Sequence, residues 1–153
     1  MNTLYSLLPD AVATIDAHSK QAILEALAER FARVYELDAV EVLERIEERE
    51  KLGSTGFGRG VAIPHARVPG LKRPVAAFLR LDNPVEFDAA DGMPVDLVFG
   101  LLSPESAGVG HLQALAAISR MVREEAVHAA LTEAEDKEAL YALLANVIDR
   151  DAA

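Results

Sequence analysis

The sequence of 153 residues carries 15 basic and 25 acidic residues, a formal net charge of −10, and contains no cysteine. This length predicts one domain spanning residues 1–153, with a core over about residues 5–148. The negative charge argues against binding to nucleic acid or to an anionic membrane surface, and the lack of cysteine excludes disulfides, thiol catalysis and cysteine-based zinc sites.

The N-terminal third is expected to form one strand and two helices. Residues 12–15 form an apolar candidate strand, and Ser19 can cap the helix that follows. Asp38 with Glu41 makes a capping box for a second helix, which we expect to end near Leu52. No basic segment precedes the first lysine, and no apolar run approaches the roughly 18 residues of a membrane span. We therefore expect a cytoplasmic protein without membrane insertion.

The middle of the chain has the character of strands. A glycine-dense loop over residues 53–60 leads into an apolar strand over residues 61–63, and His65 follows directly after a proline. Residues 75–81 and 95–102, rich in Val, Leu and Phe, are two further candidate strands. The segment between those two holds turn residues and several acids, which we interpret as a solvated loop.

The C-terminal third is expected to be helical. A third helix opens at His111, a short helical piece covers residues 127–131, and Thr132 with Glu135 makes a capping box for a last helix that runs to about Ile148. Helices at both ends with strands between them predict an α/β layer fold. We expect one mixed β-sheet flanked by helices on both faces.

The glycine-dense loop and His65 together suggest a site for an anion. Four closely spaced glycines let backbone N–H groups converge on a phosphate, and Gly56 and Gly58 are candidate phosphate-binding positions. The loop matches neither a P-loop nor a dinucleotide-binding fingerprint, because the glycines precede a strand. His65 at the exit of that strand is largely neutral near pH 7, and can therefore act as a nucleophile.

Two more residues are candidate partners of such an anion. His111 opens a helix, where the positive end of the helix dipole favours a bound anion and a neutral imidazole. Arg49, at the end of the second predicted helix, has the planar fork that suits phosphoryl oxygens. The acids Glu86, Asp88 and Asp91 do not have the spacing of a calcium loop, and no helical His-x-x-x-His pair is present, so we expect neither a metal nor a cofactor.

The run from Gly53 to His65 resembles the phosphorylation-site motif of enzyme IIA proteins of the bacterial phosphotransferase system, in the fructose/mannitol/nitrogen class. Residues 94–102 and the His111-Leu112-x-x-Leu115 pattern also match that class, in order and at similar spacing. The resemblance covers nearly the whole chain, and its type-2 IIA domain has a mixed sheet flanked by helices. Within the class, the chain looks most like the nitrogen-related regulatory IIA.

The resemblance assigns roles residue by residue. It implies that His65 accepts a phosphoryl group on Nε2, that His111 hydrogen-bonds that group, and that Arg49 helps to hold it. Ser54 and Thr55 match motif positions that line the site. The donor would be a small histidine phosphocarrier protein of the HPr or NPr type, itself charged by an enzyme I from phosphoenolpyruvate. Such a protein carries a phosphohistidine intermediate and does not turn over a small substrate.

Three interpretations remain open at this point. A regulatory IIA would bind partner proteins according to its phosphorylation state. A sugar-transport IIA would pass the phosphoryl group to a IIB domain, from the same site. A protein-interaction module without phosphorylation is the alternative from another class. Relatives commonly have Gly after the phosphorylated histidine, whereas this chain has Ala66 and Arg67, and Ala66 is tolerable only if its φ is negative.

Overall fold

The computed structural model describes residues 4–152, which form five helices and a six-stranded sheet. Within this part of the chain, no helix is both long enough and apolar enough to cross a membrane. The elements in chain order are β1 (Ser6–Ile15), α1 (Lys20–Tyr35), α2 (Ala39–Lys51), β2 (Gly56–Gly58), β3 (Val61–Ala62), β4 (His65–Val68), β5 (Val75–Val85), β6 (Val95–Pro104), α3 (Val109–Arg123), α4 (Glu125–Glu133) and α5 (Lys137–Ala152).

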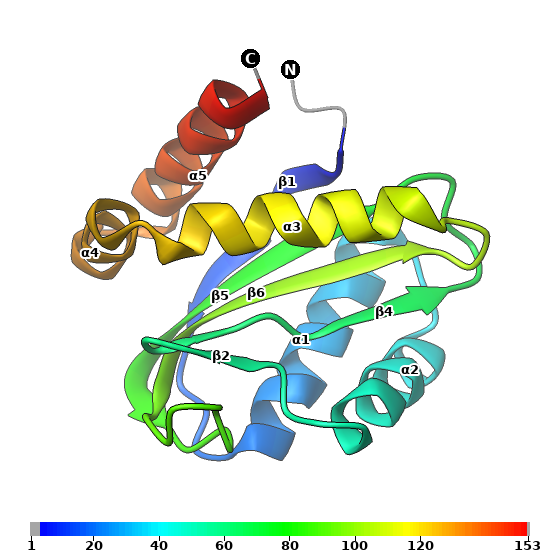
Figure 1. Ribbon diagram of the computed structural model, residues 1–153, viewed down its shortest axis with the longest axis horizontal. Coiled ribbons are helices and arrows are strands. Elements are labelled where there is room, and N and C mark those ends of the chain that lie inside the picture. Colours follow the sequence, from blue (N-terminus) through cyan, green and yellow to red (C-terminus); the bar gives the residue numbers. More distant parts are fainter. Residues whose placement is uncertain (1–3, 153) are drawn as a thin grey trace.

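The sheet is mixed, as the sequence predicts. Its strand order is β1-β5-β6-β3-β2, and β4 pairs with β6 beyond the end of β3. β6 runs antiparallel to β5 but parallel to β3 and β4, and β1 runs parallel to β5. Helices α1 and α2 lie on one face of the sheet and α3 crosses the other (Figure 1).

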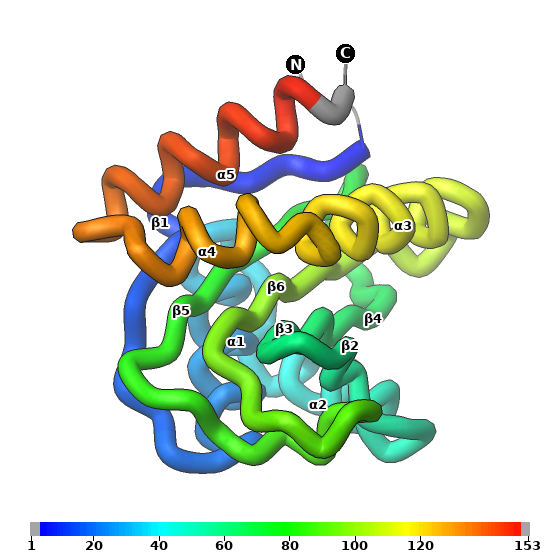
Figure 2. Tube along the Cα trace, turned by 60° about the vertical axis from the view of Figure 1, so that its left-hand side comes forward, coloured from blue at the N-terminus to red at the C-terminus, as the bar shows by residue number. Residues whose placement is uncertain are grey.

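Two apolar clusters fill the space between the sheet and its two helical layers. One joins buried side chains of α1 and α2, among them Phe31 and Ile46, to one face of the strands. The other joins α3, α4 and α5 to the opposite face, around Phe78 and Phe99. α5 lies along β1, so the first and last elements of the fold are neighbours (Figure 2). This arrangement confirms the predicted α/β fold with helices on both faces.

The local start signals of the first two helices are confirmed. Ser19 accepts a hydrogen bond from the Ala22 amide, and Asp38 accepts from the amides of Val40 and Glu41. Each side chain thereby satisfies an N–H group that has no partner within the helix. Gly53 follows the end of α2, as predicted.

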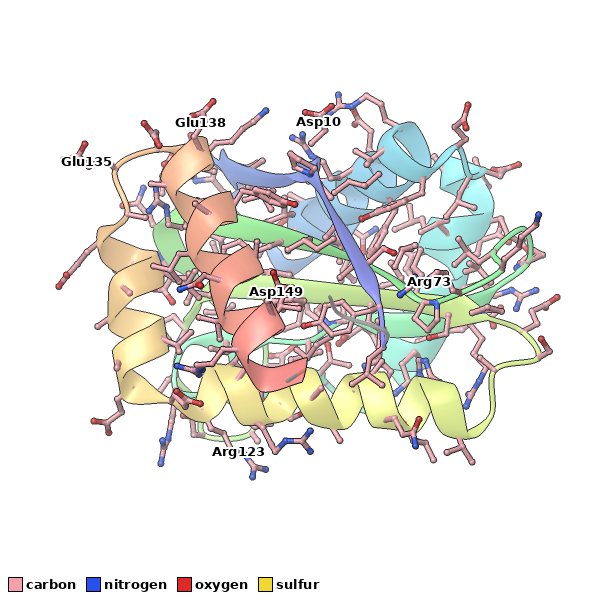
Figure 3. The ribbon with its side chains drawn as sticks, turned by 90° about the horizontal axis from the view of Figure 1, so that it is seen from above. Asp10, Arg73, Arg123, Glu135, Glu138 and Asp149 are labelled. Atoms are coloured by element: carbon pink, nitrogen blue, oxygen red, sulfur yellow. The ribbon has the colours of Figure 1, made fainter. Side chains whose placement is uncertain are left out.

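The start of the last helix is a correction. α5 begins at Lys137, and the side chain that caps it is that of Asp136, whose Oδ1 accepts from the Ala139 amide at 2.8 Å. Thr132 lies inside α4 and donates its hydroxyl to the His128 carbonyl instead. Glu135 is exposed in the turn before α5, where Figure 3 shows it pointing outward. Two capping patterns overlap in this stretch, and the later one starts the helix.

Candidate functional site

The pairing of β4 with β6 decides which side chains share a face. In this parallel pair His65 lies beside Leu101, and Arg67 lies beside Ser103. Leu101 belongs to the cluster under α3, and alternate residues of a strand point to the same face. His65, Arg67 and Ser103 therefore face the α3 layer.

His65 stands where the chain changes strands. β3 ends at Ala62, Ile63 and Pro64 are irregular, and β4 begins at His65 itself. Sequence analysis placed His65 at a strand exit; the structure places it at the first position of the next short strand. In β4, Ala66 is buried and its φ is not among the positive values, so the replacement of glycine by alanine is tolerated here.

A cleft of about 400 Å³ brings together the three residues that the sequence singled out as catalytic. The end of α2 contributes Arg49, β4 contributes His65, and the first turn of α3 contributes His111. The complete lining is Arg45, Glu48, Arg49, Leu52, His65, Ala66, Arg67, His111, Leu112 and Leu115. Three elements separated in sequence thus converge at the edge of the sheet beside β4.

The hydrogen bond at His65 determines which ring nitrogen is free. Its Nδ1 lies 2.7 Å from the Ile63 carbonyl oxygen. A carbonyl oxygen only accepts, so Nδ1 must carry the hydrogen and Nε2 keeps its lone pair. Burial lowers the pKa of His65, and the positive charges of nearby Arg49 and Arg67 lower it further. The hydrogen bond to the Ile63 carbonyl acts in the opposite direction but does not outweigh burial. The ring is therefore held neutral with Nε2 as its nucleophilic atom.

His111 is the second imidazole of the cleft. Only 4% of the residue is exposed, and its ring centroid lies 5.7 Å from that of His65. Its Nδ1 lies 2.7 Å from the hydroxyl oxygen of Ser103. Burial lowers the pKa of His111 to about 4, and the positive charge of Arg67 and the neighbouring His65 add to the effect. Near neutral pH both imidazoles are accordingly uncharged.

The cleft holds cations that can receive an anionic group. Arg49 donates from Nη1 to the Gly53 carbonyl at 2.9 Å, and Arg67 donates from Nε to the Ala107 carbonyl. Neither guanidinium forms an ion pair within residues 4–152, which leaves donor groups of both for a ligand. Arg45 is different, because it pairs with Glu41 and Glu105.

Four predicted phosphate-binding residues lie outside the lining of the cleft. The Ser54 hydroxyl donates to the Phe87 carbonyl and accepts from the Gly56 amide, while Thr55 donates its hydroxyl to Glu50. Gly56 packs so closely that a Cβ there would lie 2.6 Å from the Ala89 Cα. Gly58 has a φ of 112° and borders Asp91. These contacts give the loop a structural role, and a direct contact of its residues with phosphate stays a prediction.

The loop is tied to the helices by a buried carboxylate. Glu50, next to Arg49 in α2, accepts from the Thr55 amide and pairs with Lys20 at 2.9 Å. Only 6% of its side chain is exposed. Because Glu50 joins the start of α1, the end of α2 and the loop before β2, it holds the segment that leads to His65.

Other charged groups near the loop do not join the cleft. Arg59, which belongs to the glycine-dense loop, lines a different pocket with Arg123 and His128. Among the residues described, no group of three or more metal-ligating side chains is found. Asp91 stabilises the loop in which it lies. Its carboxylate accepts hydrogen bonds from the amides of Arg59 and Met93, and these bonds lower the pKa of Asp91.

The rim of the cleft is apolar, although two apolar residues near His65 in the sequence, Phe57 and Val68, do not line it. Val68 is buried, and Phe57 packs against the cluster under α3 with Arg123 over its ring. The exposed apolar side chains that line the cleft are instead Leu52, 84% exposed after α2, and Leu112, 63% exposed on α3. The sequence does not reveal that these two leucines lie at the rim, because a single exposed leucine has no signature of its own.

Comparison with known proteins identifies the family. Residues 7–147 match the family described as phosphoenolpyruvate-dependent sugar phosphotransferase system, EIIA 2. The chain belongs to this family. The candidate cleft contains His65, the last residue of the motif over residues 53–65 that carries the family resemblance.

Individual relatives agree with the assignment. The chain is 46% identical to a nitrogen regulatory protein of Pseudomonas aeruginosa, over 90% of each chain. It is 40% identical to the fructose-specific EIIA component of Haloferax volcanii, over 80% of this chain and 79% of that one. The crystal structure of nitrogen regulatory protein IIA-Ntr from Neisseria meningitidis superposes with a TM-score of 0.83 at 38% identity, covering 90% of this chain and 95% of that one. The chain is therefore a phosphotransferase-system IIA protein whose relatives include regulatory and sugar-specific members.

Proposed function

We propose that this IIA protein accepts a phosphoryl group on Nε2 of His65 from a histidine phosphocarrier protein of the HPr or NPr type. The observation that carries the proposal is the Nδ1 bond of His65 to the Ile63 carbonyl, which leaves the Nε2 lone pair unused in a cleft. Two guanidinium groups that form no ion pair within residues 4–152, those of Arg49 and Arg67, line the same cleft. The donor would itself be charged from phosphoenolpyruvate, so the reaction belongs to the cytoplasm.

The transfer needs no cofactor in this proposal. The Nε2 lone pair attacks phosphorus in line, a P–N bond forms, and the bond to the donor's ring nitrogen breaks with its electron pair returning to that ring. Positive charge then develops on the His65 ring, where the Ile63 carbonyl stabilises the Nδ1–H. Arg49 and Arg67 face the phosphoryl oxygens, and His111 supplies a further donor.

We favour a regulatory function, in which the phosphorylated and unphosphorylated forms of the protein bind different partners. The relative with 46% identity and the solved structure with 38% identity are both nitrogen regulatory proteins. We propose that a phosphoryl group on His65 adds about two negative charges beside exposed Leu52 and Leu112, and so changes which protein docks there. Regulatory target proteins are then the partners of this surface.

Sugar transport is the second candidate, favoured by the 40% identity to a fructose-specific EIIA component. It uses the same histidine and differs in the acceptor. A purified IIB domain would remove the phosphoryl group from His65 under the transport hypothesis and leave it in place under the regulatory one. An interaction module without phosphorylation predicts that His65 is never labelled.

Intact-mass spectrometry after incubation with phosphoenolpyruvate, enzyme I and a phosphocarrier tests the proposal. We expect an acid-labile gain of one phosphoryl group that is lost in His65→Ala. His18→Ala is the matched control, because this exposed imidazole lies beside Asp16 and outside the cleft. His111→Ala should keep acceptance but slow it by about 10²–10³, the usual cost of one stabilising donor. Labelling of the His65→Ala protein would refute the assignment.

A further inference from the structure

Ser103 is a buried hydroxyl that neither the motif nor the lining of the cleft includes. It lies near the end of β6, in an apolar stretch, with an exposed fraction of 0%. Its partner in the β4 register is Arg67, which lines the cleft. A hydroxyl that is fully buried needs a partner within the protein, because an unpaired buried hydroxyl is destabilising.

The geometry offers the Ser103 hydroxyl one partner. Its Oγ lies 2.7 Å from Nδ1 of His111, and within residues 4–152 no other hydrogen bond involves the Ser103 side chain. If Nδ1 of His111 carried the hydrogen and donated to Oγ, the hydroxyl hydrogen of Ser103 would have no acceptor. If Ser103 donates instead, one hydrogen bond satisfies the hydroxyl and the ring nitrogen together.

We propose that Ser103 is the positioning residue that holds His111 as its Nε2–H tautomer, by donating its hydroxyl hydrogen to Nδ1. The inference rests on the proposed phosphoryl transfer for its functional meaning. His65 and His111 then carry opposite tautomers: Nε2 of His65 presents a lone pair, and Nε2 of His111 presents an N–H. A lone pair attacks phosphorus and an N–H binds a phosphoryl oxygen, so each ring has the form its role requires.

The energetic sense of this arrangement follows from the surroundings of His111. Protonation of Nδ1 would break the bond from Ser103 and place a positive charge near Arg67 and His65. Burial, Arg67 and His65 together lower the pKa of His111, which agrees with the charge part of that penalty. Without the hydroxyl, Nδ1 has no donor facing it, and the two neutral tautomers of His111 become close in energy.

The first test measures the tautomer directly. Long-range ¹H–¹⁵N NMR on the wild-type protein, with no donor present, should show His111 protonated on Nε2 and His65 protonated on Nδ1. In Ser103→Ala we expect a second, Nδ1–H population of His111, with His65 unchanged. A wild-type His111 protonated on Nδ1 would overturn the proposal. Since no phosphoryl donor is used, this result is independent of whether His65 is ever phosphorylated.

The second test separates positioning from mere folding. Ser103→Ala should slow phosphoryl acceptance by about 10–10²-fold, less than His111→Ala, because it weakens what His111 contributes without removing the ring. In a His111→Ala background, Ser103→Ala should change the rate by less than about twofold. Equal slowing in both backgrounds would show a general structural effect and refute the role.

A hydroxyl-retaining variant completes the set. Ser103→Thr keeps the donor and should keep the Nε2–H tautomer of His111, although its extra methyl group enters a fully buried position. If the protein does not tolerate that methyl group, the wild-type spectrum and the Ser103→Ala double-mutant cycle still decide the question. If the wild-type protein shows the expected tautomers but does not accept a phosphoryl group, the proposed function is refuted. The role of Ser103 in fixing the tautomer of His111 would still stand.

Discussion

Protonation of His111 should make the protein lose stability between pH 6.5 and pH 4. The neutral ring is favoured in the folded protein, where the pKa is about 4, whereas an unfolded chain has a histidine pKa of about 6.5. Between these values the unfolded state binds more protons, so stability rises with pH. The contribution is fully present above about pH 6.5 and is lost as the pH falls toward 4.

The size of the effect follows from the two pKa values. If the pKa of His111 changes from about 6.5 in the unfolded chain to about 4 in the folded protein, proton linkage at this one site lowers the unfolding free energy by about 2.4 kcal/mol between pH 7 and pH 4.5. His111 borders an open cleft, and solvent there screens the charge, which reduces the expected loss to about 1–1.5 kcal/mol. Arg67 and His65, which face the ring, are the charged and titratable neighbours that contribute.

Urea unfolding of wild type and His111→Gln at pH 7.0 and pH 4.5 measures this term. The wild-type protein should lose about 1–1.5 kcal/mol more than the variant over that interval, because the variant has no imidazole to protonate. Titration of groups remote from His111 is common to both proteins and cancels in the comparison. His18→Gln, which removes an exposed imidazole outside the cleft, is the matched control. Parallel pH dependence of wild type and His111→Gln would refute the reasoning.

Three other substitutions test the framework around the cleft. Gly56→Ala should lower the unfolding free energy by about 1–3 kcal/mol in urea denaturation, since its Cβ would lie 2.6 Å from backbone at Ala89, while Gly108→Ala, with open space, is the control. Glu50→Gln should lower the unfolding free energy by about 1–2 kcal/mol, because it removes the ion pair with Lys20. Glu50 also raises the pKa of His65, so NMR titration of the variant should show a lower pKa for His65 than in wild type. Arg49→Ala should slow phosphoryl acceptance by about 10², while thermal denaturation shows a loss under about 1 kcal/mol, because the Arg49 side chain bonds only locally, to the Gly53 carbonyl within residues 4–152. A large thermal loss would instead make Arg49 a structural residue.

Elements with local signals were predictable from sequence. Ser19 and Asp38 start helices because each can satisfy a free N–H within its own turn, which needs no tertiary information. β1 is longer than expected. It begins at Ser6, but its register to β5 shifts between Leu7 and Val12, and this irregularity removes the period-two pattern that sequence analysis requires.

The site was predictable in part. His65, His111 and Arg49 could be named from the motif and from helix ends, and the structure brings them into one cleft. Ser103 could not be named, because its meaning depends on the register between β4 and β6 and on the first turn of α3. The signal available was small: a serine in an apolar strand, two residues after Leu101 and so on the same face.

The cleft also explains how a strongly acidic protein can suit a phosphoryl group. The net charge is −10, yet Arg49 and Arg67 stand free of carboxylates at the cleft while Arg45 pairs with Glu41 and Glu105. The same two cations lower the pKa of His65, so they favour its neutral, nucleophilic form. A doubly negative phosphoryl group on Nε2 would reverse the sign of that field and favour a positively charged ring. Under the proposed function the two cations would therefore act twice: with burial, they would favour a neutral His65 before transfer, and they would balance the phosphoryl charge after it.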